Sequence, residues 1–232
     1  MTTSDMEVPS AVDSPSTASV DISMFDYTPS YCEENVYLLC KKLCMIGVAD
    51  AEGSDLFVVF ISNENRHVPL WHQKASSRAD GVILWDYHVI CIQKNREGKA
   101  LYQVWDLAST LPFPAPLAHY VSEVVQPSFQ LYPEYQRLFR VVHAPLFLRF
   151  FASDRRHMKD SVGNWISPPP THENIVAEDG TVHNLDEYIR VSAADVVPDI
   201  RDDSFKAVLS QKFGLVINES QLEGFFTSFV DN

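Results

Sequence analysis

The strongest constraint in the sequence is a pair of segments rich in β-branched and aromatic residues, 82–92 and 101–106. A short polar stretch separates them, which is typical of two strands joined in a β-hairpin. A three-residue loop at 96–98, with glycine in the third position, would suit a type I turn followed by a bulge. This loop pairs Asn95 with Lys99, so paired residue numbers sum to 194, and His88 is predicted directly opposite Asp106 on one face. An imidazole held by a carboxylate is half of a nucleophilic site.

A second segment, residues 29–37, can supply the nucleophile. Ser30 followed three residues later by Glu33 has the pattern of a capping box, which predicts a helix with Ser30 as its N-cap. Gly47 is expected to end this helix. Cys32 would lie in the first turn, where unpaired N–H groups and the helix dipole favour a thiolate. The apolar stripe of the helix would consist of Val36, Leu39, Cys40 and Leu43.

These residues also have purely structural interpretations. A free cysteine is most often a small core residue, and a histidine–aspartate pair across two strands can simply stabilise a sheet. Cys91 alternates out of phase with His88 and is expected in the core. Trp85 and Tyr87 are expected on the face opposite His88, where core packing is the usual role of aromatic residues.

A metal site is the alternative use of the cysteines. Cys40 and Cys44 lie four residues apart on the predicted helix and could bind zinc with His67 or His72. The sequence contains neither a CxxC pair nor an HExxH motif, so we expect no metal. It also contains no glycine-rich phosphate loop, and we expect no cofactor.

Two short motifs connect the predicted helix and hairpin to a known family. Tyr-Cys-Glu-Glu-Asn at 31–35 and Trp-Asp-Tyr-His-Val at 85–89 resemble protein N-terminal glutamine amidohydrolase, the family known by the second motif. The resemblance spans roughly residues 27–215 and implies a Cys-His-Asp triad at Cys32, His88 and Asp106. It continues through residues 59–64, Asp106 with 111–114, and residues 139–141, 151–155, 157–161 and 163–165.

The resemblance implies a papain/transglutaminase-like core and a specific reaction. A family member converts the N-terminal glutamine of a protein or peptide to glutamate through a cysteine thioester, releases ammonia, and so feeds the N-degron pathway. A papain-like protease or a transglutaminase-type acyltransferase would use the same triad, and a non-catalytic interaction module is the alternative of a different class. Selection of a free N-terminus requires an acceptor for its ammonium group, and Asp86 and Glu33 are the candidates.

Length and charge limit the remaining possibilities. A chain of 232 residues fits one domain with a real core. A formal net charge of −13 argues against nucleic acid or an anionic membrane as the main partner. No apolar run reaches the roughly 20 residues of a membrane span, and no basic-plus-apolar signal opens the chain. We therefore expect reduced cysteines and a cytoplasmic location. We also expect a monomer and a nuclear pool, which the composition itself does not indicate.

The order of predicted elements indicates an α+β fold, an α/β sandwich with a mostly antiparallel twisted sheet flanked by helices. Residues 1–26 have the composition of a disordered acidic tail, and 27–232 are expected to form a single catalytic domain. Residues 215–232 have no assigned role. Strands are predicted at 56–61, at 67–72 as its hairpin partner, and at 139–143; further helices are predicted at 146–151, 185–190 and 204–213.

Overall fold

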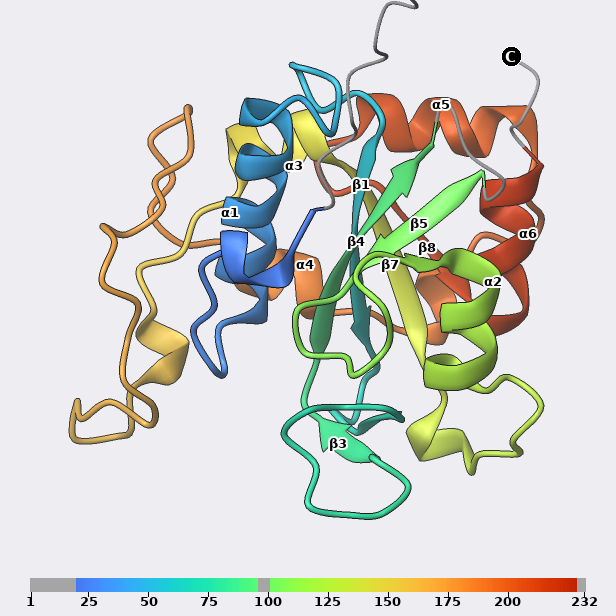
Figure 1. Cartoon of the computed structure of the whole chain (residues 1–232), viewed down its shortest axis with the longest axis horizontal. Helices are drawn as coiled ribbons and strands as arrows, with labels where there is room; N and C mark the ends of the chain where they lie inside the picture. The colour runs from blue at the N-terminus through green and yellow to red at the C-terminus, as the bar shows by residue number, and fades with distance from the viewer. Residues whose placement is uncertain (1–19, 96–100, 229–232) are drawn as a thin grey trace, which may run out of the picture.

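A computed structural model describes residues 20–95 and 101–228 of the chain (Figure 1). The strands are β1 (Leu56–Ser62), β2 (Val68–Leu70), β3 (Ile83–Trp85), β4 (His88–Lys94), β5 (Tyr102–Trp105), β6 (Ala115–Pro116), β7 (Leu138–His143) and β8 (Leu215–Asn218). Six of them form one sheet in the order β6-β5-β4-β1-β7-β8, and all pairings between these named strands are antiparallel. The predicted α+β fold with a mostly antiparallel sheet is therefore confirmed, whereas the likeness to the papain and transglutaminase core stays a prediction.

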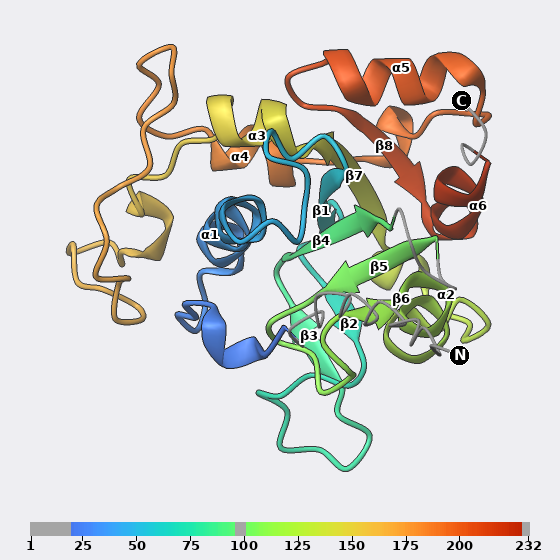
Figure 2. The ribbon, with the colours of Figure 1, turned by 45° about the horizontal axis from the view of Figure 1, so that its top comes forward.

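Helices cover both faces of the sheet. The α-helices are α1 (Cys32–Met45), α2 (Leu117–Tyr120), α3 (Ala144–Phe150), α4 (Leu185–Ile189), α5 (Asp202–Ser210) and α6 (Leu222–Thr227). Shorter helical turns are η1 (Ile22–Met24), η2 (Val121–Val125), η3 (Pro133–Tyr135), η4 (Arg156–Met158), η5 (Ala193–Asp195) and η6 (Glu219–Gln221). Residues of α1, α3 and α4 pack on one face, and residues of α2, α5 and α6 pack on the other (Figure 2).

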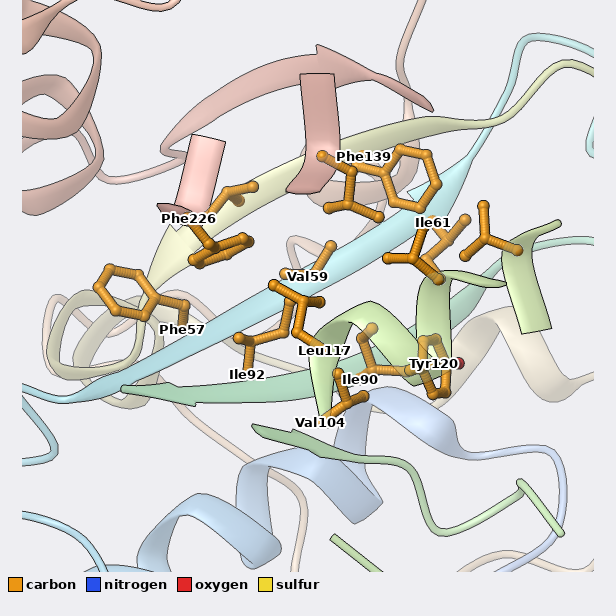
Figure 3. Packing of buried hydrophobic residues seen from close by; sticks show 14 of the residues in the cluster. Phe57, Val59, Ile61, Ile90, Ile92, Val104, Leu117, Tyr120, Phe139 and Phe226 are labelled. Carbon is orange, nitrogen blue, oxygen red and sulfur yellow. The ribbon is translucent and has the colours of Figure 1, made fainter. Parts of the chain in front are cut away.

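The central strand β1 explains why the sheet needs two helical layers. All seven of its residues are buried, so the segment reads as a continuous apolar run and not as an alternating one. Its odd-numbered residues Phe57, Val59 and Ile61 belong to the cluster on the α2 and α6 side, which Figure 3 shows. The even-numbered residues Leu56, Val58 and Phe60 belong to the cluster under α1 and α3.

Helix α1 has the predicted apolar stripe but not the predicted start. Val36, Leu39, Cys40 and Leu43 are all buried, and Gly47 has a φ of +71° just beyond the helix end. The capping box is wrong: Tyr31 is the N-cap residue and its side chain makes no capping hydrogen bond. Ser30 has a φ of +70°, and the Glu33 carboxylate is buried and bound elsewhere, so neither can play its predicted part.

The predicted hairpin strand at 82–92 is broken at Asp86 and Tyr87. Its first part, β3, pairs with β2 in a separate two-stranded sheet, and only β4 joins the main sheet. The prediction that residues 67–72 return along β1 is therefore wrong, because β1 pairs with β4 and β7. Pro69 fits this short sheet, where it faces Leu84.

The register of β4 with β5 also differs from the prediction. Cys91 faces Trp105 and Ile92 faces Val104, so paired residue numbers sum to 196 and not to 194. The backbone N–H of Asn95 donates to the carbonyl of Leu101, in agreement with the observed register. The loop predicted at 96–98 lies outside the described residues.

The segment without an assigned role, residues 215–232, contributes to the core as far as it is described. Strand β8 extends the sheet beside β7, and Phe225 and Phe226 of α6 are fully buried in the cluster on the α2 and α6 side. Figure 3 shows Phe226 in this cluster. At the other end, residues 1–19 of the expected tail lie outside the description, while Phe25 is buried against Trp105 and Phe113.

The other predicted elements are present with shifted ends. The strand expected at 139–143 is β7, and the three helices expected at 146–151, 185–190 and 204–213 correspond to α3, α4 and α5. Among the described residues, we find no helix that is both long and apolar enough to cross a membrane.

Candidate active site

The start of α1 brings Cys32 to a cavity of about 340 Å³. His88 and Asp106 line the same cavity, so the structure brings together all three residues of the predicted triad. The volume lies in the range of small-ligand pockets, roughly 300–1,000 Å³. The first-turn N–H groups of a helix have no intrahelical partner, and at Cys32 they are available to an anionic oxygen.

His88 and Asp106 form a buried, hydrogen-bonded pair. The Nε2 atom of His88 lies 3.0 Å from Oδ1 of Asp106, and the side chains are 1% and 2% exposed. The two residues are not directly opposite each other, contrary to the prediction. In the observed register Asp106 would face Ile90, two residues from His88, so the side chains of His88 and Asp106 meet diagonally across the two strands. The Nδ1 atom of His88 is buried and has no hydrogen-bond partner within the described structure, so it is free to exchange a proton with a group in the cavity.

Further donors hold the Asp106 carboxylate in place. The Tyr120 hydroxyl donates to Oδ2 at 2.8 Å, and the backbone N–H of Ala108 donates to Oδ1 at 2.9 Å. Burial alone would raise the pKa of Asp106, but the His88 ring and these hydrogen bonds hold the pKa below its usual value. Asp106 is therefore an anion that orients the imidazole. Tyr120 was not predicted as a site residue, because no spacing rule connects it to the hairpin.

The electrostatic environment of Cys32 differs from the expectation. Burial raises the pKa of the thiol well above that of a free cysteine, and the carboxylates of Glu33 and Asp86 raise it further. The backbone N–H of Val89 opposes this shift, but does not reverse it. The prediction of a resting thiolate is thus wrong, because desolvation and the nearby carboxylates, Asp106 among them, outweigh the one hydrogen bond that favours the anion. The thiol needs a base in order to react, and a histidine lines its cavity.

The two predicted ammonium acceptors have different surroundings. Asp86 is exposed and lines the cavity, and its Oδ1 accepts a hydrogen bond from the backbone N–H of Tyr87. Glu33 is fully buried and does not line the cavity. Its Oε2 accepts the Tyr87 hydroxyl at 2.8 Å, and its Oε1 lies 3.4 Å from Nε2 of His157.

The two aromatic residues of the Trp-Asp-Tyr-His-Val motif are not placed as predicted. Because the strand breaks before β4, Trp85 and Tyr87 do not share a face opposite His88. Tyr87 is buried and reaches Glu33, whereas the Trp85 ring stacks on His88 with centroids 5.3 Å apart and an angle of 18° between planes.

A long loop between α3 and α4 forms another wall of the cavity. His157, Met158 and Ile166 of this loop line the cavity, and the loop extends away from the sheet on the α1 side (Figure 1). Arg155 anchors it by donating from Nε and Nη2 to the buried Glu34 carboxylate of α1 at 2.9–3.1 Å. Long loops within a domain are often functional, and this one contributes three residues to the wall of the cavity.

The cysteines outside the cavity are free thiols in the structure. Cys91 is in the core, as expected, and its sulfur lies 3.7 Å from that of Cys40. Within residues 20–95 and 101–228, no group of three or more His, Cys, Asp or Glu side chains could hold a metal ion. The alternative of a zinc site at Cys40 and Cys44 therefore has no support there.

A cysteine at the start of a helix, in one cavity with an aspartate-bound histidine, is the arrangement of enzymes that transfer acyl groups through a cysteine nucleophile. The comparisons with known proteins narrow this class. The profile of the N-terminal glutamine amidase family matches residues 27–226. The chain therefore belongs to this family of amidohydrolases.

Similar proteins come from plants and insects. The chain is 61% identical over 209 residues to "Protein N-terminal glutamine amidohydrolase" of Arabidopsis thaliana, covering 90% of this chain and 95% of the relative. The protein of the same name in Oryza sativa subsp. indica is 56% identical over 211 residues, with 90% of each chain covered. The Drosophila melanogaster protein of that name is 43% identical over 172 residues, covering 74% of this chain and 82% of the relative.

Proposed function

We propose that this protein deamidates the side chain of an N-terminal glutamine, giving an N-terminal glutamate and ammonia through a thioester on Cys32. The observation that carries the proposal is the common cavity of Cys32, His88 and Asp106 in a member of the N-terminal glutamine amidase family. The relatives carry the name of this activity, which supports the choice of substrate.

The proposed reaction starts from a neutral thiol. His88 takes the proton of Cys32 at Nδ1 as the sulfur attacks the side-chain amide carbon, and Asp106 stabilises the resulting imidazolium from the other side of the ring. The backbone N–H of Cys32 donates to the oxyanion. His88 then passes its proton to the departing ammonia and leaves a thioester. A water molecule, deprotonated by His88, hydrolyses the thioester and regenerates the thiol.

We assign the α-ammonium group of the substrate to Asp86. Asp86 is exposed and lines the cavity, and one of its oxygens accepts a single backbone hydrogen bond. The carboxylate can therefore accept a hydrogen bond from another donor. Glu33 is the weaker candidate, because its carboxylate is buried, already accepts the Tyr87 hydroxyl, and does not line the cavity. Binding at Asp86 would require a substrate with a free α-ammonium group. The enzyme would therefore act only on the first residue of a chain.

A papain-like protease or a transglutaminase would use the same three residues, Cys32, His88 and Asp106. A non-catalytic interaction module would catalyse no reaction. Peptides beginning with Gln, with Asn and with acetyl-Gln separate these functions. We expect ammonia only from the Gln peptide, without peptide cleavage and without incorporation of an added amine. Peptide cleavage would indicate a protease, amine incorporation would indicate a transglutaminase, and no reaction with any peptide would favour the interaction module.

Cys32→Ala is the decisive variant. We expect ammonia release to stop while the fold survives, because Cys32 is only partly buried at the border of the core and the change removes a single sulfur atom. Cys44→Ala on the same helix is the matched control, since Cys44 does not line the cavity, and its turnover should equal that of the wild type. Normal turnover by Cys32→Ala would remove Cys32 from the mechanism.

In the cell, we propose that the product feeds the N-degron pathway, in which a new acidic N-terminus marks a protein for degradation. The substrates would then be cytoplasmic and also nuclear proteins with a free N-terminal glutamine. We propose that the enzyme acts as a monomer, since all three proposed catalytic residues come from one chain.

A further inference from the structure

The stacking of Trp85 on His88 is a contact that the proposed mechanism does not yet use. The two ring centroids are 5.3 Å apart and the ring planes are 18° from parallel. Both residues line the cavity. The imidazole thus has the Asp106 carboxylate at Nε2 and an aromatic face against its ring, while Nδ1 remains without a partner in the described structure.

The position of the indole is set by elements outside the main sheet. Trp85 is the last residue of β3 and faces Val68 of β2. Its Nε1–H donates to Oε1 of Gln73 at 3.2 Å, and Gln73 is itself buried and donates from Nε2 to the carbonyl of Trp71 at 2.9 Å. The small β2–β3 sheet therefore holds the indole against the catalytic histidine through backbone pairing and one side-chain hydrogen bond.

We infer that Trp85 is a positioning residue: its aromatic face fixes the plane of the His88 ring and stabilises the imidazolium that forms when Cys32 loses its proton. An aromatic face within about 6 Å attracts a cation, and the attraction is stronger when water is excluded. His88 is almost completely buried, and a buried cation is costly in free energy unless neighbouring groups stabilise its charge. Asp106 stabilises the imidazolium in the plane of the ring, and the aromatic face of Trp85 stabilises it from above that plane.

This role differs from simple packing. Trp85 is only partly buried and lies at the border of a hydrophobic cluster, so filling space does not by itself require an aromatic ring. A leucine would also fill space, but it has no quadrupole to stabilise a cation. The proton balance is unchanged by the indole: the proton leaves Cys32 Sγ, resides on His88 Nδ1, and passes to the leaving nitrogen.

The inference rests on the proposed function, and two aromatic-versus-aliphatic variants test it. For Trp85→Leu, we expect kcat for a Gln peptide to fall at least about tenfold, equal to about 1.4 kcal/mol of barrier, with KM changed by less than about threefold. For Trp85→Phe, which keeps an aromatic face, kcat should remain within about threefold of the wild type. Leu84→Ala, an exposed position on the same strand, should leave both constants unchanged.

A second readout does not depend on the glutamine substrate. Alkylation of Cys32 by iodoacetamide at neutral pH should slow in Trp85→Leu and stay near the wild-type rate in Trp85→Phe, because the thiolate needs the imidazolium beside it. Absence of ammonia release by the wild type would refute the proposed function, while the alkylation rates would still decide the role of Trp85.

Equal kcat values and equal alkylation rates for Trp85→Leu and Trp85→Phe would overturn the inference, as would an effect confined to KM. If Trp85→Leu does not fold, Gln73→Leu decides, since it keeps the indole and removes its hydrogen bond, together with the hydrogen bond from Gln73 to the carbonyl of Trp71. A loss of kcat with an unchanged KM in Gln73→Leu supports the inference, and unchanged turnover refutes it.

Discussion

Replacing Asp86 by asparagine should change the reactivity of Cys32 and the turnover of substrate in opposite directions. In the free protein, burial is the main cause of the raised pKa of Cys32, and the carboxylates of Glu33 and Asp86 add to it. Removing one of these charges lowers the pKa of the thiol toward its usual value. A larger thiolate fraction at pH 7 then makes alkylation by iodoacetamide faster than in the wild type.

Turnover should fall, because the same variant removes the proposed partner of the substrate ammonium. The Oδ1 atom of Asp86 accepts one backbone hydrogen bond, and the carboxylate faces the cavity. One hydrogen bond to a charged group is worth about 1.5–3 kcal/mol, which corresponds to a loss of roughly 10- to 150-fold in kcat/KM. The preference for a free N-terminus should shrink by a similar factor, since acetyl-Gln peptides never used this contact.

The assay measures iodoacetamide alkylation of Cys32 and ammonia release from Gln and acetyl-Gln peptides with the same preparations. Asp186→Asn is the control, because Asp186 also lines the cavity but pairs with Arg66 at 3.4 Å and is not among the main causes of the raised pKa of Cys32. It should alter neither rate appreciably. If Asp86→Asn slows both alkylation and turnover, general damage to the site is the explanation. If it keeps full turnover and full discrimination, Asp86 does not bind the ammonium group.

Two further predictions concern stability. Tyr120→Phe removes a hydrogen bond to Asp106 and should lower the free energy of unfolding by about 1–2 kcal/mol at pH 7 in urea titrations. Because the folded-state pKa of Asp106 is lowered, its stabilisation is present above the unfolded pKa and is lost as the pH falls, so the difference should shrink below about pH 4. Glu34→Gln breaks a buried ion pair with Arg155, in which the side chains are 0% and 7% exposed, and should cost about 3–5 kcal/mol, or roughly 6–20 °C in Tm. The exposed pair of Arg149 and Glu178 is its control: Glu178→Gln should change the free energy of unfolding by less than about 1 kcal/mol, and an equal loss in both variants would contradict the role of burial.

The elements that the sequence predicted correctly are those whose pattern is local. The apolar stripe of α1 follows a helical period, and β1 is a continuous apolar run bounded by polar residues. Gly47 is in the left-handed region that a glycine after a helix commonly adopts. Each of these features depends on a few residues that are close in the sequence, so the sequence alone is sufficient to predict it.

The features that sequence reasoning missed depend on distant partners. Glu33 fits a capping box, but in the folded chain its carboxylate is bound by Tyr87, 54 residues away. Glu34 on the same turn pairs with Arg155, 121 residues away. Burial of these two acids overrides the local preference for capping, because a buried carboxylate must have partners wherever the fold can supply them.

His88 and Asp106 are in contact even though the predicted register was wrong, and the two-residue period of a strand explains why. Paired residue numbers sum to 196 in the structure and to 194 in the prediction, so the strand is shifted by two residues. Because side chains alternate between the faces of a sheet, a shift of two leaves every side chain on its predicted face. His88 and Asp106 therefore remain on one face and meet diagonally at 3.0 Å. An error of one would have turned the aspartate to the opposite face, where Trp105 is buried. The alternation of side chains between faces was thus the part of the hairpin argument that led to the site, and the turn type was not needed for it.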